Sequence, residues 1–286
     1  MVWSCLVSIL PGMAQTEKLT DYVNPFVGTD GYGNVYPGAQ IPFGGIQISP
    51  DTDSRFYDAA SGYKYNHLTL MGFSLTHLSG TGIPDLGDFL FIPGTGEMKL
   101  EPGTHEDPDQ GYRSRYSHDK EWASPNYYAV ELADYGVKAE MTSGVRSGMF
   151  RFTYPESDNA FIMIDMNHTL WQSCEWSNLR MINDSTITGY KLVKGWGPER
   201  HVYFTATFSK KLTGLRFVQD KKPVIYNTSR FRSSYEAWGK NLMACISFDT
   251  KAGEEVTVKT AISAVSTDGA RNNMKELDGL TFNELR

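Results

Sequence analysis

Short stretches of alternating apolar and polar residues dominate the chain and recur roughly every ten to twenty residues. They are rich in β-branched and aromatic residues and are separated by Gly, Pro, Asn and Asp, the pattern of β-strands joined by turns. No long helical pattern falls between them, so the sequence predicts an all-β fold, a large antiparallel β-sandwich with strands over most of residues 120–262. The clearest stretches are residues 127–132, 138–142, 148–154, 160–165, 202–208 and 255–261.

Two regions depart from this alternation. Residues 24–112 hold many Gly and Pro residues and few clean strands, and such long loops in a compact domain are usually functional or disordered. Their many aromatic residues argue against disorder. In residues 268–286, apolar residues recur at roughly helical spacing up to the end of the sequence. We therefore expect a short helix there that leads into a further part of the polypeptide.

Composition narrows the partners that such a fold would bind. The 286 residues fit one large all-β domain or two ordinary ones. A formal net charge of −6 argues against nucleic acid or an anionic membrane, since both attract clustered Lys and Arg. Aromatic residues form 13% of the chain. Their rings suit the faces of pyranose sugars, but Tyr also suits half-buried strands, so both interpretations stay open.

The N-terminus carries the marks of an export signal. A short apolar run at residues 5–10 precedes the small residues Gly12 and Ala14, as at a signal-peptide cleavage site. The usual basic residues are missing before it, so a buried strand is the alternative. We expect residues 1–14 to be a signal-peptide remnant and the protein to be secreted or periplasmic. No later apolar run approaches the ~20 residues of a membrane span.

The densest chemical signal is the sequence GFSLTHLSGTG at residues 72–82. Glycines in such a turn permit positive φ angles and close approach of the backbone to a ligand. Asp85 and Asp88 follow, so an imidazole, several hydroxyls and two carboxylates fall within one short stretch. The pattern is not a phosphate loop, because no Lys follows the glycines and no helix is indicated after them. A Gly-rich turn with a structural histidine is the alternative to a ligand-binding loop.

Several co-linear motifs, taken together, resemble the N-terminal domain of glycoside hydrolase family 92. The resemblance runs from about Leu19 to the C-terminus. The turn at residues 72–82 carries most of it, and the other motifs are Asn24-Pro25-Phe26, Tyr36-Pro37-Gly38-Ala39, Pro42-Phe43-Gly44, Ser61-Gly62-Tyr63, Gly111-Tyr112, Thr142-Ser143 with Arg146, and Ser266 with Gly269-Ala270.

The resemblance implies a galactose-mutarotase-like supersandwich over residues 19–267, and from residue 268 a linker helix towards an (α/α)6 barrel. Family members look like calcium-dependent, exo-acting α-mannosidases that invert anomeric configuration at the junction of the two domains. Inversion needs a carboxylic acid and a carboxylate base ~6.5–9.5 Å apart. The family places both on the barrel, with most groups around the calcium ion. We therefore expect no catalytic residue and no metal ligand in this chain.

The resemblance also implies that loops of the sandwich close the pocket over the terminal mannose. On this interpretation the turn bonds sugar hydroxyls, Asp88 braces it, and His77→Ala lowers turnover while the sandwich stays folded. Phe56 and Tyr57 stand where relatives specific for α-1,2 linkages carry Trp, and either ring faces the leaving-group sugar or merely packs. The full set of candidate substrate-binding residues is Phe56, Tyr57, Gly62, Tyr63, His77, Ser79, Gly80, Thr81, Gly82 and Asp88.

Other attractive residues are assigned structural roles. Trp176 and Trp196 lie in stretches that resemble sugar-stacking loops, but a Trp in a large sandwich belongs more often to the core. Arg146 either braces a turn or touches ligand. Cys174 and Cys245 could form one bridge, but buried thiols are the expected state. The remaining histidines show no metal-ligand spacing and are taken as structural or solvated: His67, His105, His118, His168 and His201.

The sequence therefore predicts the N-terminal domain of a bacterial inverting α-mannosidase of the α-1,2 type. The intact enzyme would use calcium and its own C-terminal catalytic domain to remove terminal mannose from glycans, and this chain alone would be inactive. A stand-alone carbohydrate-binding β-sandwich without catalysis is the alternative. A structural or adhesive sandwich without a ligand is a third interpretation.

Overall fold

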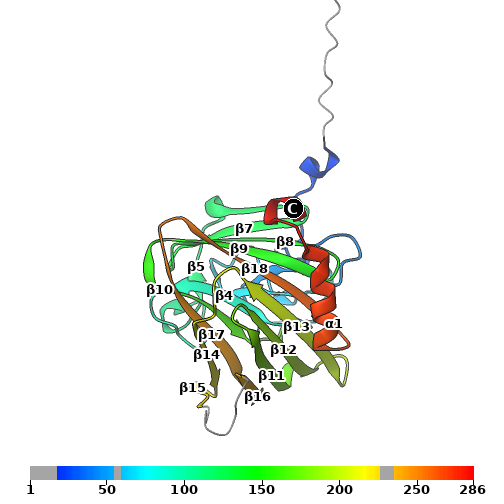
Figure 1. Ribbon diagram of the computed structural model, residues 1–286. Coiled ribbons are helices and arrows are strands. Elements are labelled where there is room, and N and C mark those ends of the chain that lie inside the picture. The colour runs from blue at the N-terminus through cyan, green and yellow to red at the C-terminus, as the bar shows by residue number, and fades with distance from the viewer. Residues whose placement is uncertain (1–17, 55–58, 226–234) are drawn as a thin grey trace, which may run out of the picture.

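A computed structural model describes residues 18–54, 59–225 and 235–286. Two large β-sheets packed against each other form most of the molecule (Figure 1). Every strand pair in this part of the chain is antiparallel, so the predicted antiparallel β-sandwich is confirmed. The expected signal-peptide remnant, residues 1–14, lies outside the described residues, as do Phe56 and Tyr57.

The larger sheet has nine strands, and much of it is built from hairpins between strands consecutive in the sequence. This is why the alternating pattern predicted it well. In spatial order its strands are β16 (Glu236–Gly239), β11 (Ser173–Asn183), β12 (Thr186–Lys194), β13 (Arg200–Phe208), β18 (Glu254–Ser263), β9 (Ser147–Tyr154), β8 (Val137–Ser143), β7 (Tyr127–Leu132) and β6 (Glu121–Ser124).

The smaller sheet has seven strands and takes its first three from the loop-heavy N-terminal region. In spatial order these are β1 (Ser49–Asp51), β3 (Gly72–Ser74), β4 (Leu90–Thr95), β10 (Ser157–Asp165), β17 (Leu242–Thr250), β14 (Gly214–Gln219) and β15 (Lys222–Pro223). A separate two-stranded sheet pairs β2 (Thr69–Leu70) with β5 (Ser114–Arg115). Single turns of 3-10 helix occur at η1 (Leu19–Tyr22), η3 (Pro108–Gln110) and η4 (His118–Lys120).

The main core lies between the two sheets, because alternate residues of each strand point inwards. The ring of Phe91 lies 4.9 Å from that of Phe150 and 6.4 Å from that of Phe204, all three fully buried. A second apolar cluster, which includes Ile92 and Phe161, covers the other face of the smaller sheet. Both faces of that sheet are therefore covered.

The C-terminal segment is helical, as expected. Helix α1 (Thr267–Asn273) packs against β18 and β13, and the Ser266 hydroxyl caps it by accepting the Gly269 N–H at 2.9 Å. Then come η5 (Met274–Leu277) and α2 (Phe282–Leu285), whose apolar residues pack against β7 and β9. In the described part of the chain no helix is long and apolar enough to cross a membrane.

Candidate functional site

The turn at residues 76–88 connects β3 to β4 and has an exposed half and a buried half. Ser79, Gly80 and Gly82 are exposed, whereas His77 and Asp88 are buried. The N–H of Gly80 donates to the carbonyl of Asn34 at 2.7 Å, which anchors the exposed half. A Cβ at Gly80 or Gly82 would meet nothing within 4 Å. The exposed half can therefore be approached closely by a ligand.

Asp51 lies at the centre of the buried half, although it is distant from the turn in sequence. Its Oδ1 lies 2.8 Å from Nε2 of His77, and its Oδ2 lies 2.8 Å from Nε2 of His168. The three side chains are almost completely excluded from solvent. Burial alone would raise the pKa of Asp51, but the charge of His77 and the hydrogen bonds from both histidines hold that pKa below its usual range.

The hydrogen-bond partners of His77 lie on both sides of its ring. Its Nδ1 lies 2.8 Å from the carbonyl oxygen of Gln47, which can only accept, so this nitrogen carries a proton. Its Nε2 faces the Asp51 carboxylate and, at 3.1 Å, the Ser74 hydroxyl. The ring is therefore bonded on both sides within the protein, and it holds the turn against β1.

Asp88 is a completely buried carboxylate within the turn itself. Its Oδ1 lies 3.1 Å from Nζ of Lys191, and its Oδ2 accepts hydrogen bonds from Arg200 at 2.6 Å and from the Thr76 hydroxyl at 2.7 Å. Lys191 is itself fully buried and also donates to the carbonyl of His168 at 2.5 Å. Burial would raise the pKa of Asp88, but the charges of Lys191 and Arg200 outweigh it and lower that pKa. The bond to Thr76 braces the turn from within.

Gly62 and Tyr63 lie behind Asp51. Gly62 has φ of +85°, and a Cβ there would lie 2.1 Å from Oδ1 of Asp51, so only glycine leaves room for the carboxylate. The hydroxyl of Tyr63 donates to Glu121 at 2.9 Å, and its ring is buried. Gly62 therefore leaves room for the Asp51 carboxylate that holds His77, and Tyr63 ties this segment to β6.

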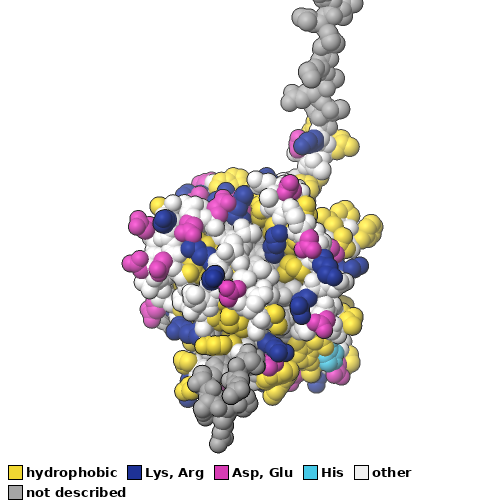
Figure 2. All heavy atoms as spheres, viewed as in Figure 1, with side chains coloured by type: hydrophobic (Ala, Val, Ile, Leu, Met, Phe, Trp, Pro, Cys, Tyr) yellow, Lys and Arg dark blue, Asp and Glu magenta, His cyan; other side chains and the backbone are white. Residues whose placement is uncertain are grey.

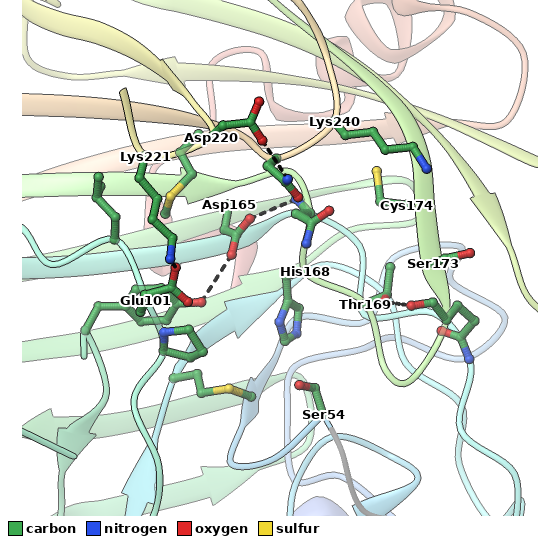
Figure 3. Close-up of a pocket in the computed structure, with 18 of the residues that line it drawn as sticks. Ser54, Glu101, Asp165, His168, Thr169, Ser173, Cys174, Asp220, Lys221 and Lys240 are labelled. Carbon is green, nitrogen blue, oxygen red and sulfur yellow. Dashed lines mark hydrogen bonds and ion pairs between the residues drawn. The ribbon is translucent and has the colours of Figure 1, made fainter. Parts of the chain in front are cut away.

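A pocket of about 910 Å³ opens beside this network, on the side of His168 (Figure 3). Asp165 at the end of β10 and Ser173 at the start of β11 contribute to its walls, and so does Ser54. Of the predicted substrate-binding residues that the structure describes, none lines it. His168 connects the two places, because it lines the pocket and bonds Asp51, which in turn bonds His77.

Sequence reasoning did not single out His168, Lys191, Arg200 or Trp171 for the site. His168 and Asp51 are 117 residues apart, and Arg200 and Asp88 are 112 apart. No local motif marks such pairs, because the pairing of distant strands brings them together.

The tryptophan and cysteine expectations had different outcomes. The expectation that Trp176 and Trp196 belong to the core is wrong, since they are 46% and 64% exposed. Trp176 lies on the outer face of β11, which the smaller sheet does not cover, and Trp196 lies in the turn between β12 and β13. Cys174 and Cys245 are buried, unbridged thiols, as expected.

The described residues do not fit a metal site. Nowhere in residues 18–54, 59–225 and 235–286 do three or more His, Cys, Asp or Glu side chains come together so that they could hold a metal ion. Asp51 is already bonded to His77 and His168, and Asp88 is already paired with Lys191 and Arg200. The described residues therefore offer a calcium ion no group of three carboxylates.

Comparison with known proteins gives a consistent result. The model of the glycosyl hydrolase family 92 N-terminal domain matches residues 22–263. An uncharacterized secreted glycosidase of Arthroderma benhamiae is 30% identical over 139 residues, a match that covers 48% of this chain and 17% of that protein.

Two solved structures are similar over almost the whole chain. The family GH92 glycosyl hydrolase ccman5 is 28% identical with a TM-score of 0.78, and the match covers 93% of this chain and 35% of that one. A family GH92 inverting mannosidase from Bacteroides thetaiotaomicron VPI-5482 shares the fold, with 24% identity, a TM-score of 0.75 and coverage of 94% and 35%. The chain thus spans about a third of the length of these two structures.

Proposed function

This chain belongs to glycosyl hydrolase family 92 as its N-terminal domain, and from that premise we propose that it is the β-sandwich of an inverting, exo-acting α-mannosidase. The enzyme removes terminal α-1,2-linked mannose from glycans. The observation that carries the proposal is the family match over residues 22–263. The description of the Arthroderma benhamiae relative as secreted supports export, and we place the protein outside the cytoplasm of a bacterium.

The catalytic acid and base are assigned to a C-terminal (α/α)6 domain that packs on this one. Inversion requires an acid and a base that reach the glycosidic bond and a water molecule from opposite sides. Asp51 and Asp88 are completely buried and bonded to cationic side chains, so neither can take such a role. Calcium is assigned to the same second domain, since the described residues here do not fit it.

The sandwich contributes the surface that closes over the sugar. In the exposed half of the turn, Ser79, Gly80, Thr81 and Gly82 offer backbone groups and hydroxyls to the mannose. The buried residues Gly62, Tyr63, His77 and Asp88 hold that half in place and are positioning residues. Phe56 and Tyr57, which lie outside the described residues, are assigned to contact with the leaving-group sugar.

A carbohydrate-binding module without catalysis is the second candidate, and one observation favours it. Trp171, Trp176, Trp196 and Trp238 are all substantially exposed, which is unusual for large apolar side chains. Exposed indole rings provide flat apolar faces for sugars, with or without a catalytic domain.

The test compares the full-length gene product with residues 18–286 alone. Release of mannose from α-1,2-mannobiose is followed by ¹H NMR, which also reports the anomer formed first, in calcium and in EDTA. We expect turnover with inversion by the full-length protein only. Turnover by residues 18–286 would refute the placement of the acid and base. Saturable mannoside binding without turnover by the full-length protein would favour the module.

A further inference from the structure

Trp171 combines exposure with a strained backbone. It lines the pocket of about 910 Å³, is 61% exposed and has φ of +71°. A bulky residue rarely adopts this left-handed conformation, and such strain persists only where the surrounding structure imposes it. Strained residues of this kind cluster at binding sites. The indole ring is therefore accessible to a ligand in the pocket.

The bonds that impose the strain lie on both sides of Trp171. The N–H of Leu170 donates to the carbonyl of Leu86 at 3.0 Å, and the side-chain amide of Gln172 donates to the carbonyl of Pro84 at 2.5 Å. Both acceptors belong to the turn at residues 76–88. The Thr169 hydroxyl also donates to the carbonyl of Gln172 at 2.7 Å, closing the loop on itself. The backbone that carries the indole is thus tied to the turn that we assign to mannose binding.

The lysines around the pocket are paired, as Figure 3 shows for its left wall, where Lys221 meets Glu101 at 2.5 Å. Lys240 is paired with Glu175 at 3.1 Å. Asp165 accepts a hydrogen bond from the Tyr112 hydroxyl at 3.1 Å. Anion sites use cationic groups that are available to the ligand, and both lysines of this lining already hold a carboxylate. The pocket is therefore suited to a neutral polar ligand.

The remaining features fit a sugar. Oε1 of Gln172 is buried and has no hydrogen-bond partner among the described residues, so it can accept from a hydroxyl. The volume is near the upper end of the ~300–1,000 Å³ usual for small-molecule pockets, enough for a disaccharide. A flat indole face beside polar groups is the arrangement that binds the apolar face and hydroxyl edge of a pyranose.

We propose that this pocket is a carbohydrate subsite in which the indole of Trp171 stacks on a pyranose ring of a neutral oligosaccharide. The proposal rests on the proposed function, which sets the orientation of the glycan relative to the cleaved bond. An exo-acting enzyme removes the terminal unit, so every further ring of the substrate lies on the leaving-group side. The Trp171 pocket then holds a ring beyond the one that is next to the cleaved bond, and it favours longer glycans over mannobiose.

The test uses the strain itself. In Trp171→Gly the positive φ becomes unstrained, so the melting temperature of the chain should rise by a few degrees while affinity for α-1,2-mannotriose falls about tenfold or more. The matched control is Trp122→Ala, a 45% exposed indole on β6 that does not line the pocket, with affinity unchanged. The affinities of wild type and both variants are measured by isothermal titration calorimetry. In wild type, the shift of the Trp171 indole N–H signal in ¹⁵N spectra, which Trp171→Gly identifies by its loss, shows whether the sugar reaches the ring.

The outcomes separate this subsite from the proposed function. A Trp171→Gly chain that melts lower would show that the ring is a packing residue, and a Trp171 signal that mannotriose leaves unmoved would show that the pocket does not bind sugar. Either result overturns the subsite. A Trp171 signal that moves equally with maltotriose supports the subsite, because the subsite is proposed for a neutral oligosaccharide. In the full-length protein, Trp171→Gly should raise KM for mannotriose and not for mannobiose. A KM for mannotriose equal to that of the wild type overturns the subsite.

Discussion

Nε2 of His77 lies 2.8 Å from Oδ1 of Asp51, and both side chains are completely excluded from solvent. A buried ionic contact adds little net stability compared with apolar residues of the same size, but removing one partner leaves the other unpaired at considerable cost. The contact therefore serves mainly to fix the position of the turn on the sandwich.

The first prediction is that His77→Ala destabilises the domain by about 3 kcal/mol or more, because it leaves the Asp51 carboxylate short of a partner in the interior. The sequence alone predicted a ligand contact whose loss spares the fold, and the burial of the ring changes that expectation. Urea unfolding measures the effect. The control is Ser79→Ala in the exposed half of the same turn, expected within ~0.5 kcal/mol of wild type. Equal stabilities for the two variants would contradict this role.

The second prediction concerns acid. The folded pKa of Asp88 lies below its usual range, so its ionised form contributes stability above the unfolded pKa of about 3.9 and loses it as the pH falls towards the folded pKa. The free energy of unfolding should drop steeply below about pH 4, and less steeply in Asp88→Asn. Unfolding midpoints from pH 2.5 to pH 7 measure the slopes. The exposed Asp109, paired with Arg115, is the control, and Asp109→Asn should leave the slope close to that of wild type.

A third prediction separates crowding from backbone strain at two glycines. At Gly31, φ is +58° and a Cβ meets nothing, so Gly31→Ala should cost only the ~1–2 kcal/mol of the left-handed conformation. At Gly62 a Cβ also collides with Asp51 at 2.1 Å. Gly62→Ala should therefore cost clearly more and should alter the His77 ring N–H signals in NMR spectra. Equal costs would show that the space around Asp51 is not restrictive.

A fourth prediction addresses the pair formed by Asp88 and Lys191. Asp88→Asn and Lys191→Met should each cost about 3–5 kcal/mol, because each leaves a buried charge with fewer partners. The double variant should cost less than the sum, by more than the ~0.5 kcal/mol found for independent sites. Additive effects would mean that Arg200, and not Lys191, neutralises Asp88.

The fold was predictable because its signal is local. The alternation at residues 148–154 and 202–208 falls within β9 (Ser147–Tyr154) and β13 (Arg200–Phe208), since a strand with one face on the core shows its period directly. The first strands were less visible. β1 and β3 have three residues each, all buried, so they show no alternation.

The sequence predicted where the site lies but not which residues contact one another there. The glycines and polar residues of the turn marked it, but nothing near His77 indicated that Asp51 would bury its ring. Trp171 shows the same limit, because the strain that distinguishes it is a backbone angle. Trp residues are highly buried on average, but Trp176 is exposed because it lies on a sheet face that is not covered, and the sequence does not show which face that is.

The contact between Lys191 and Asp88 also affects how this domain can evolve. Most apolar core residues can be exchanged one at a time for others of similar size, each step costing little. A lineage that changes Lys191 or Asp88 must first pass through a chain with an unbalanced buried charge, and then acquire the second change before selection removes the first. Drift should therefore be fast between the sheets and slow at the end that carries the turn, so that the sequences of two descendants diverge while the position of the turn stays the same.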